Sequence, residues 1–340
     1  MTTKYFNHLV EKLGARQDYF PGTGGNVSFK TDTKTMLIKA SGKRIAHMND
    51  EEGVVALSYQ GIKEHFRKTV PHKEGEKVSS ELIAISVDVN ASGRPSIETG
   101  FHTLLSNAVI HSHSAYVNMF TCSTSFEKIA ETLFFGSRIS YLCISYAQPG
   151  YYLTHLFLEK VIRLSSAPRV IFMKNHGVVV SAPTLAEAID LHEEVNQRVM
   201  RYFSITEEVY PKALLTHQGE MKSKSRTKFL HDFVLANMYI FENINQYILF
   251  PDLTVFCQDI YVTRDDTFPS KIIIHKDTGE IIYNTTKKEA HCIEENLIAF
   301  AFLLTYMKAH HLSPVYISQK EADSIRNMEQ EKYRKLLLQK

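Results

Sequence analysis

A glutamate followed by a His-x-His pair is the chain's most specific chemical pattern. Glu98 precedes His111 and His113, which fall in the segment 108–113, expected as a strand. Side chains alternate between the two faces of a strand, so both imidazoles point the same way. Two imidazoles on one face can hold a transition metal, and Glu98 could then act on a metal-bound substrate without being a ligand. The pattern predicts half of a metal site with a carboxylate beside it.

A third histidine, His176, extends the possible ligand set. It follows the apolar segment 169–174, expected as a buried strand, and lies where α/β sites usually form, at a strand end. Three histidines with an open fourth position suit catalytic zinc, and Glu98 could move a proton beside the polarised carbonyl. Sixteen histidines occur in the chain, so a chance spacing of two is the alternative explanation for His-x-His.

Two glycine-containing turns offer backbone amides to an anion. Residues 22–25 precede an expected strand at 27–30, and Ser41-Gly42 follows an expected strand at 36–40. Converging N–H groups in such turns can hold a phosphate. Neither turn has the pattern of a Walker loop or of a Rossmann fingerprint. The alternative is two tight turns, the second with solvated cations at 43–44.

The elements that would position these residues follow an α/β order. We expect further strands at 54–58, 83–89, 139–145 and 178–180, and helices at 4–19, 99–106, 116–122, 126–134, 152–164 and 184–202. The last helix has Thr184 as its expected N-cap and Glu187 in the capping-box position.

The composition changes at residues 211–228, and we expect a linker at 213–228. A C-terminal α+β extension of unknown role follows at 229–340. It contains a helix to about residue 245, a hairpin around 277–279, and helices at 289–310 and from about 319. The basic run 222–228 is a weak candidate for contacts with a phosphate backbone.

Composition excludes several classes of function. The 340 residues are 44 % hydrophobic and 22 % charged, the balance of an ordinary globular protein. A formal net charge of +2 gives no case for nucleic acid or an anionic membrane. Four cysteines without a CxxC pair fit a reducing compartment. Residues 1–12 are polar, and no apolar run approaches the ~20 residues of a membrane span. We therefore expect a soluble cytoplasmic protein.

Several motifs in one order resemble the class II aldolase/adducin family. They span about residues 5–210 and read GTGGNVS (22–28), KASG (39–42), RPSIETGFH (94–102), IHSHS (110–114), YAQPG (146–150), KNHGVVV (174–180) and LAEAIDLHEEV (185–195). The segments FPD (250–252) and IRNMEQEKYRK (325–335) resemble the end of the aldolase half of predicted bifunctional rhamnulose-phosphate aldolase/dehydrogenase proteins. A dehydrogenase half does not occur in this sequence.

The resemblance implies a fold and an assembly. The expected fold is a three-layer α/β/α arrangement with a mainly antiparallel central sheet in a catalytic domain at 1–212, to which the extension is added. A homotetramer with its sites at subunit interfaces is the implied assembly.

The resemblance also implies an activity. Zn2+ or another divalent metal would bind His111, His113 and His176, and Glu98 would be the catalytic acid/base. The expected phosphate-binding residues are Gly25, Asn26, Ser41, Gly42 and Ser96. The expected reaction cleaves a small phosphorylated ketose of the fuculose/rhamnulose-1-phosphate type to dihydroxyacetone phosphate and an aldehyde, through a metal-stabilised enediolate.

The sequence departs from the family pattern near the site. Ile97 replaces a second phosphate-binding serine, and Gly100 replaces an expected proline. The segment 127–135 lacks the tyrosine that serves as proton donor in fuculose-phosphate aldolases. Glu131 or Tyr146 could substitute for it.

Two alternative functions remain open. A sugar-phosphate epimerase or dehydratase would use the same metal site, although epimerases of the family tend to carry Asp where this chain has Glu98. An adducin-like interaction module without catalysis would use the extension for binding. Such modules lose the metal histidines, and this chain retains all three.

Overall fold

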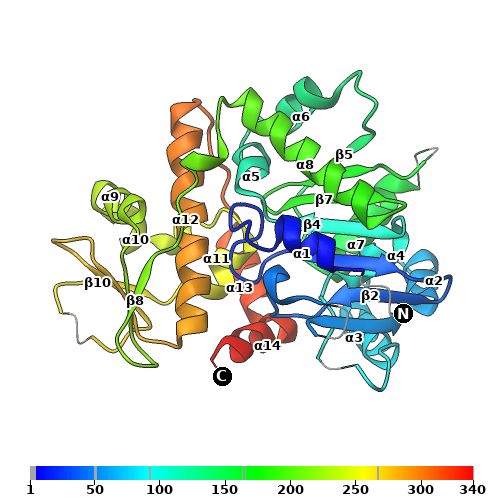
Figure 1. The fold of residues 1–340 in the computed structure, drawn as a ribbon, viewed down its shortest axis with the longest axis horizontal. Helices are drawn as coiled ribbons and strands as arrows, with labels where there is room; N and C mark the ends of the chain where they lie inside the picture. The colour runs from blue at the N-terminus through cyan, green and yellow to red at the C-terminus, as the bar shows by residue number, and fades with distance from the viewer. Residues whose placement is uncertain are drawn as a thin grey trace.

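The structure is a computed structural model that describes residues 5–49, 52–91, 93–162, 164, 166–265 and 268–339. Seven strands among these residues form a main sheet in the order β3-β2-β1-β4-β7-β6-β5 (Figure 1). Their bounds are β1 Asn26–Lys30, β2 Thr35–Lys39, β3 Val54–Ser58, β4 Ala108–Ser112, β5 Tyr141–Ile144, β6 Val170–Met173 and β7 Gly177–Ala182. Neighbouring strands are antiparallel except for the parallel pair β5 and β6. The expected mainly antiparallel sheet is confirmed.

Helices cover both faces of this sheet. One face carries α1 Asn7–Leu13, α5 Ala115–Thr121, α6 Phe126–Phe134 and α8 Leu185–Tyr202. The other carries α2 Gln60–Lys68, α3 Gly75–Ile85, α4 Thr99–Leu104 and α7 Tyr151–Val161. Along β7, Val178 and Val180 join one hydrophobic cluster and Val179 joins the other, as the alternation of a strand requires. The expected three-layer α/β/α fold is confirmed.

One expected strand is wrong, and one capping prediction is confirmed. Residues 83–89 were expected to be extended, but Ile83 lies in the helix α3. A short apolar run fits either structure, and here the buried side follows helical spacing, because Ser79, Leu82 and Ile83 face the core. Thr184 and Glu187 form the expected capping box of α8. Residue 4 of the expected helix 4–19 and residue 163 of the helix 152–164 lie outside the described residues.

The C-terminal half has a sheet of its own. Five strands of the described chain pair in the order β10-β11-β12-β9-β8, with bounds β8 Leu215–His217, β9 Ser223–Ser225, β10 Ile260–Thr263, β11 Ile272–His275 and β12 Ile281–Tyr283. The segment 213–228, expected as a linker, carries β8 and β9 of this sheet. β11 and β12 form the expected hairpin.

The helices of the extension join the two halves. They are α9 Lys228–Ala236, α10 Met238–Glu242, α11 Pro251–Phe256, α12 Lys287–Ala309, α13 Gln319–Asn327 and α14 Glu329–Leu338. Short 3-10 helices also occur along the described chain, at η1 Ile45–His47, η2 Glu207–Val209 and η3 Ile244–Gln246. The long α12 packs against α5, where the rings of Phe302 and Tyr116 meet edge to face at 5.9 Å. None of the described helices combines the length and apolarity needed to cross a membrane.

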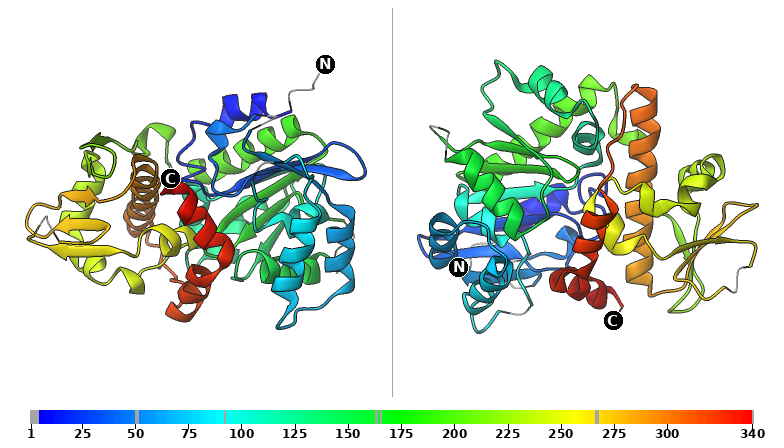
Figure 2. Two further views of the ribbon diagram at one scale, coloured as in Figure 1. Left: turned by 90° about the horizontal axis from the view of Figure 1, so that it is seen from below. Right: turned by 180° about the vertical axis from the view of Figure 1, so that it is seen from behind.

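The chain then returns to the main sheet. Figure 2 shows α14, in red, between α12 and the N-terminal half. The Arg94 guanidinium lies 4.4 Å from the centre of the Tyr333 ring, so α14 contacts the loop that precedes Glu98. One hydrophobic cluster runs from Phe6 to Leu338 and joins both halves. The extension is therefore packed on the N-terminal half at the end of the sheet where the histidines lie.

Candidate metal centre and active site

The three expected metal ligands lie together. His111 belongs to β4, His113 directly follows it, and His176 lies in the turn between β6 and β7. Their ligand nitrogens are within 4.8 Å of one another, and all three side chains are buried. A Cβ on Gly177 would lie 2.2 Å from the Ser112 carbonyl oxygen. Glycine at this position lets the turn approach β4 and bring His176 to the other two histidines.

Hydrogen bonds fix how two of the rings are oriented. The Nδ1–H of His111 donates to the Val178 carbonyl oxygen at 3.0 Å, and that of His113 donates to Asp252 Oδ2 at 2.7 Å. These acceptors leave the lone pair on Nε2 in both rings. The two Nε2 atoms lie 3.1 Å apart, near the roughly 3.3–3.4 Å expected for two nitrogens about 2.0–2.1 Å from one tetrahedral ion. Two facing lone pairs repel unless a cation lies between them.

The electrostatics also fit a metal. Burial lowers the pKa of His111 well below its usual value, and burial lowers that of His176 to about 3. Both rings are therefore neutral near pH 7, the form that binds metal ions. Three buried imidazoles with an open fourth direction fit a catalytic divalent metal such as zinc.

Glu98 lies on this open side. Its Oε2 is 3.2 Å from His111 Nε2, and its Oε1 is 3.3 Å from His176 Nε2. Asn26 donates from Nδ2 to Oε2 at 2.7 Å, whereas Oε1 is buried and accepts no hydrogen bond within the described structure. The carboxylate is thus oriented through one oxygen and leaves the other for a proton or a bound group.

A buried histidine supports Asn26 from behind. His102 Nε2–H donates to Asn26 Oδ1, and Ser28 Oγ lies 2.7 Å from His102 Nδ1. Burial lowers the pKa of His102 well below its usual value, so the ring stays neutral and can accept from Ser28. This fixes the Asn26 amide with its nitrogen toward Glu98.

A small cavity of about 40 Å³ adjoins the histidines. The expected residues that line it are Gly25, Asn26, Ser41, Gly42, Ser96, Glu98, His113 and His176. Ile97, which replaces the serine of the family pattern, lines it as well. The expected phosphate turns and the expected metal site thus share one cavity. His111 lies just behind it.

Sequence reasoning missed several charged residues at this cavity. They are Lys39, Asp252, Glu331 and Arg334, of which the last three belong to the extension. Lys39 is buried and donates from Nζ to the Lys43 carbonyl oxygen at 2.6 Å, and burial lowers its pKa to about 7. Asp252 and Arg334 belong to the FPD and EKYRK segments, whose resemblance to bifunctional aldolase/dehydrogenase proteins is the sequence signal for these two residues.

The two candidate substitutes for the missing tyrosine lie elsewhere. Among the described residues, neither Glu131 nor Tyr146 is part of the cavity lining. Gly100 has a packing reason, because a Cβ there would lie 2.7 Å from both Phe66 and Thr154. A proline ring at this position would not fit without movement of these side chains.

Fold and site together define a class: an α/β/α protein with a buried three-histidine metal site, an adjacent carboxylate and turns that can hold an anion. The profile of the class II aldolase and adducin N-terminal domain matches residues 8–202, and the chain belongs to this family. Aldolases and decarboxylases of the family depend on a divalent metal and act on sugar phosphates.

Several individual proteins are similar to this chain. A 3-oxo-tetronate 4-phosphate decarboxylase of Haemophilus influenzae is 22 % identical over 219 residues, 60 % of this chain and 90 % of the relative. One of Pectobacterium atrosepticum is 24 % identical over 207 residues, 56 % and 81 % of the two chains. The solved N-terminal class II aldolase domain of a conserved Thermoplasma acidophilum protein is 20 % identical, with a TM-score of 0.49 over 57 % of this chain and 90 % of that one.

Proposed function

We propose that this protein is a metal-dependent lyase that cleaves a carbon–carbon bond in a small phosphorylated substrate. The leading candidate reaction is aldol cleavage of a ketose phosphate of the fuculose/rhamnulose-1-phosphate type to dihydroxyacetone phosphate and an aldehyde. The observation that carries the proposal is the position of Glu98, whose oxygens lie 3.2 and 3.3 Å from the ligand nitrogens of His111 and His176. Family membership and the shared cavity support it.

His111, His113 and His176 would hold a divalent metal, for which we propose zinc. A bound ion would supply Lewis-acid polarisation of the substrate carbonyl. Amides and hydroxyls at Gly25, Ser41, Gly42 and Ser96, with the Asn26 amide, would hold the phosphate.

Glu98 would transfer the proton at the carbon beside the carbonyl. Cleavage leaves electrons on this carbon, as an enediolate, and the carboxyl group of Glu98 would deliver a proton to it. Asn26 keeps one carboxyl oxygen in place, so the other can reach the substrate. Burial of Glu98 would exclude bulk water from this step.

Decarboxylation of a 3-oxo acid phosphate is the second candidate. Both curated relatives carry the name of such a decarboxylase. Aldol cleavage also needs a base for the hydroxyl proton of the departing aldehyde, whereas carbon dioxide leaves without one. Neither Glu131 nor Tyr146 is part of the described cavity lining, so neither is placed to act as that base. An epimerase or dehydratase on the same metal site remains an alternative.

The reaction can be identified from its products. Zinc-loaded protein would be incubated with a panel of ketose 1-phosphates and with a 3-oxo-tetronate 4-phosphate, and the products measured by mass spectrometry. An aldolase should release dihydroxyacetone phosphate together with an aldehyde from a ketose 1-phosphate. A decarboxylase should release dihydroxyacetone phosphate together with carbon dioxide from the 3-oxo-tetronate 4-phosphate, so the co-product and the substrate consumed identify the reaction. An adducin-like binding module would give neither product and would contain no stoichiometric divalent metal.

We infer a cytoplasmic homotetramer from the family resemblance. Native mass spectrometry would give the number of chains directly, and a monomer would contradict this part of the proposal.

A further inference from the structure

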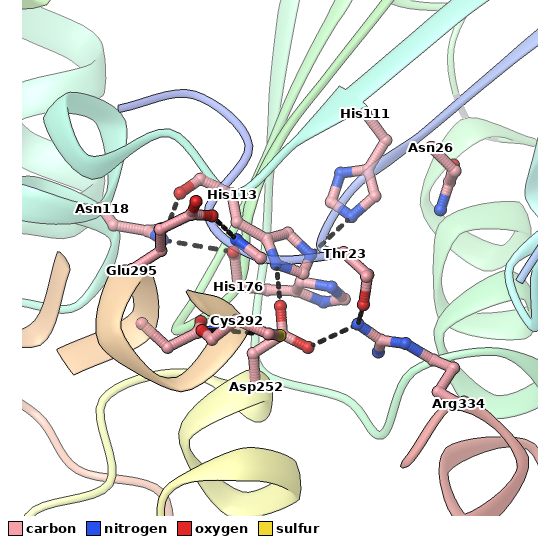
Figure 3. A network of polar contacts seen from close by, with 12 residues as sticks. Thr23, Asn26, His111, His113, Asn118, His176, Asp252, Cys292, Glu295 and Arg334 are labelled. Carbon is pink, nitrogen blue, oxygen red and sulfur yellow. Dashed lines mark hydrogen bonds and ion pairs between the residues drawn. The ribbon is translucent and has the colours of Figure 1, made fainter. Parts of the chain in front are cut away.

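A carboxylate of the extension connects the metal ligands to an arginine. Asp252, in α11, accepts from His113 through Oδ2 at 2.7 Å and from Arg334 Nη2 through Oδ1 at 2.9 Å. Figure 3 shows Asp252 between these two side chains. Asp252 is fully buried, and each of its two carboxylate oxygens holds one of these neighbours in place.

Arg334 comes from α14 and points into the same cavity as the glycine turns. Its Nη2 also donates to Thr23 Oγ1 at 3.2 Å, beside Gly24 and Gly25. The guanidinium carbon lies 5.3 Å from the Phe256 ring, and the side chain is only 13 % exposed. An arginine held at this place has both the charge and the planar set of donors that suit a phosphate.

The second edge of the guanidinium is occupied by Glu331. Arg334 Nη1 donates to Glu331 Oε2 at 2.8 Å, one helical turn earlier on α14. Glu331 lines the cavity and is 5 % exposed, so its carboxylate is desolvated. Without a substrate, this carboxylate satisfies donors that an oxyanion could satisfy equally well.

Movement of Glu331 would enlarge the cavity beside the glycine turns. A cavity of about 40 Å³ has room for about three water molecules at 10–15 Å³ each. A sugar phosphate is several times larger. Rotation of Glu331 away from Arg334 would open space next to the phosphate turns and free Nη1.

We propose that Arg334 of the C-terminal extension is the cation that selects the substrate's phosphate, and that the phosphate replaces the Glu331 carboxylate at Nη1 of the guanidinium. Asp252 holds Arg334 in place during this exchange and fixes its position relative to His113. The inference rests on the proposed function, because that function requires a phosphate in this cavity. It adds a specificity-determining residue outside the matched family segment 8–202.

Opposite effects of two substitutions would test the exchange. Binding of inorganic phosphate to the zinc-loaded full-length protein would be measured by titration calorimetry, with glycolate as a carboxylate comparison. Arg334→Gln should weaken phosphate binding by about 10- to 100-fold, because a charge-assisted, two-donor contact is lost. Glu331→Gln should strengthen it by about 3-fold or more, because the competing charge is removed. Lys332→Gln, at an exposed lysine of the same helix, should bind as the wild type does.

The outcomes separate this inference from the proposed function. Equal phosphate affinity in Arg334→Gln and the wild type, with the circular dichroism spectrum preserved, would overturn the inference even if the protein is an active lyase. If Arg334→Gln binds glycolate more weakly but binds phosphate as the wild type does, the inference is also overturned. If phosphate binding depends on Arg334 as expected but no phosphorylated substrate is cleaved, the inference stands and the proposed reaction fails. A misfolded Arg334→Gln would leave Glu331→Gln to decide, and weaker or unchanged phosphate binding there would contradict the exchange.

Discussion

At the scale of single residues, the site depends on a charge outside the segment that matches the family. His113 is oriented by Asp252, and this hydrogen bond spans 139 residues of sequence. Carboxylate–histidine pairs hold a ring in the tautomer that ligates and strengthen it as a donor to the metal. We therefore expect the aspartate to support the proposed metal site without being a ligand.

We expect Asp252→Asn to weaken zinc binding by about 10- to 100-fold, because a neutral amide orients His113 less strongly. Competition with a chromogenic chelator would measure the affinity. Asp259→Asn, at an exposed aspartate of the same extension, is the matched control and should bind zinc normally. Equal affinities in both variants would show that Asp252 has no role in metal binding.

The same residues explain how far the site could be predicted. His111 lies in β4 and His113 directly follows that strand, two positions further on, so their convergence follows from local geometry. Asp252 and Arg334 are far from the histidines in sequence, and their own contact spans 82 residues. Only the packing of α11 and α14 on the main sheet brings them there. A single sequence contains no physical rule for that packing.

At the scale of elements, the turn at 22–25 is a second determinant of the site. A Cβ on Gly24 would lie 2.6 Å from Asp252 Oδ2 and 2.7 Å from His113 Nδ1. Gly25 has a φ of 68°, and a Cβ there would lie 2.5 Å from the His111 carbonyl oxygen. The glycines were predicted to expose amides to an anion. The structure adds that they also leave room for His111, His113 and Asp252.

Gly24→Ala should therefore destabilise the protein by about 1–3 kcal/mol and weaken zinc binding, because the added methyl group separates His113 from Asp252. Urea unfolding monitored by circular dichroism would give the stability. Gly61→Ala, at an open position in α2 with no atom near the added Cβ, should instead stabilise by about 0.5–1 kcal/mol. A Gly24→Ala protein with wild-type stability and zinc affinity would contradict this account of the turn.

Regular elements were predictable to different degrees. Long periodic segments such as α8 carry both spacing and a capping box, and their positions follow from the sequence. The segment around Ile83 is short and apolar, so strand and helix were equally compatible with it, and its contacts with Phe66 and its neighbours decided for the helix.

At the scale of the molecule, two sheets are joined through one hydrophobic cluster. We propose that residues 1–212 form the catalytic domain and that the remainder completes it, since Asp252, Glu331 and Arg334 line its cavity. Because the cluster contains side chains from Phe6 to Leu338, both halves should unfold together.

Removal of the metal should lower the stability of this whole unit. The three histidines converge only in the folded chain, so a metal at 100 times its dissociation constant would stabilise it by about 2.7 kcal/mol. Addition of a chelator should lower the midpoint of thermal unfolding in the wild type. His111→Ala should show no such response. An unchanged midpoint in a wild-type protein shown to contain zinc beforehand would contradict metal binding at a site formed by folding.

The central claim is that Glu98 acts on a substrate at the three-histidine metal site without being needed to hold the metal. The most direct measurement is zinc content and turnover in the same preparations of wild type, Glu98→Gln and His113→Ala, with whichever phosphorylated substrate the product analysis identifies. Glu98→Gln should retain the wild-type zinc content and lose about 10²- to 10⁴-fold in turnover, whereas His113→Ala should lose both. Wild-type turnover in Glu98→Gln, or loss of its zinc, would contradict the account.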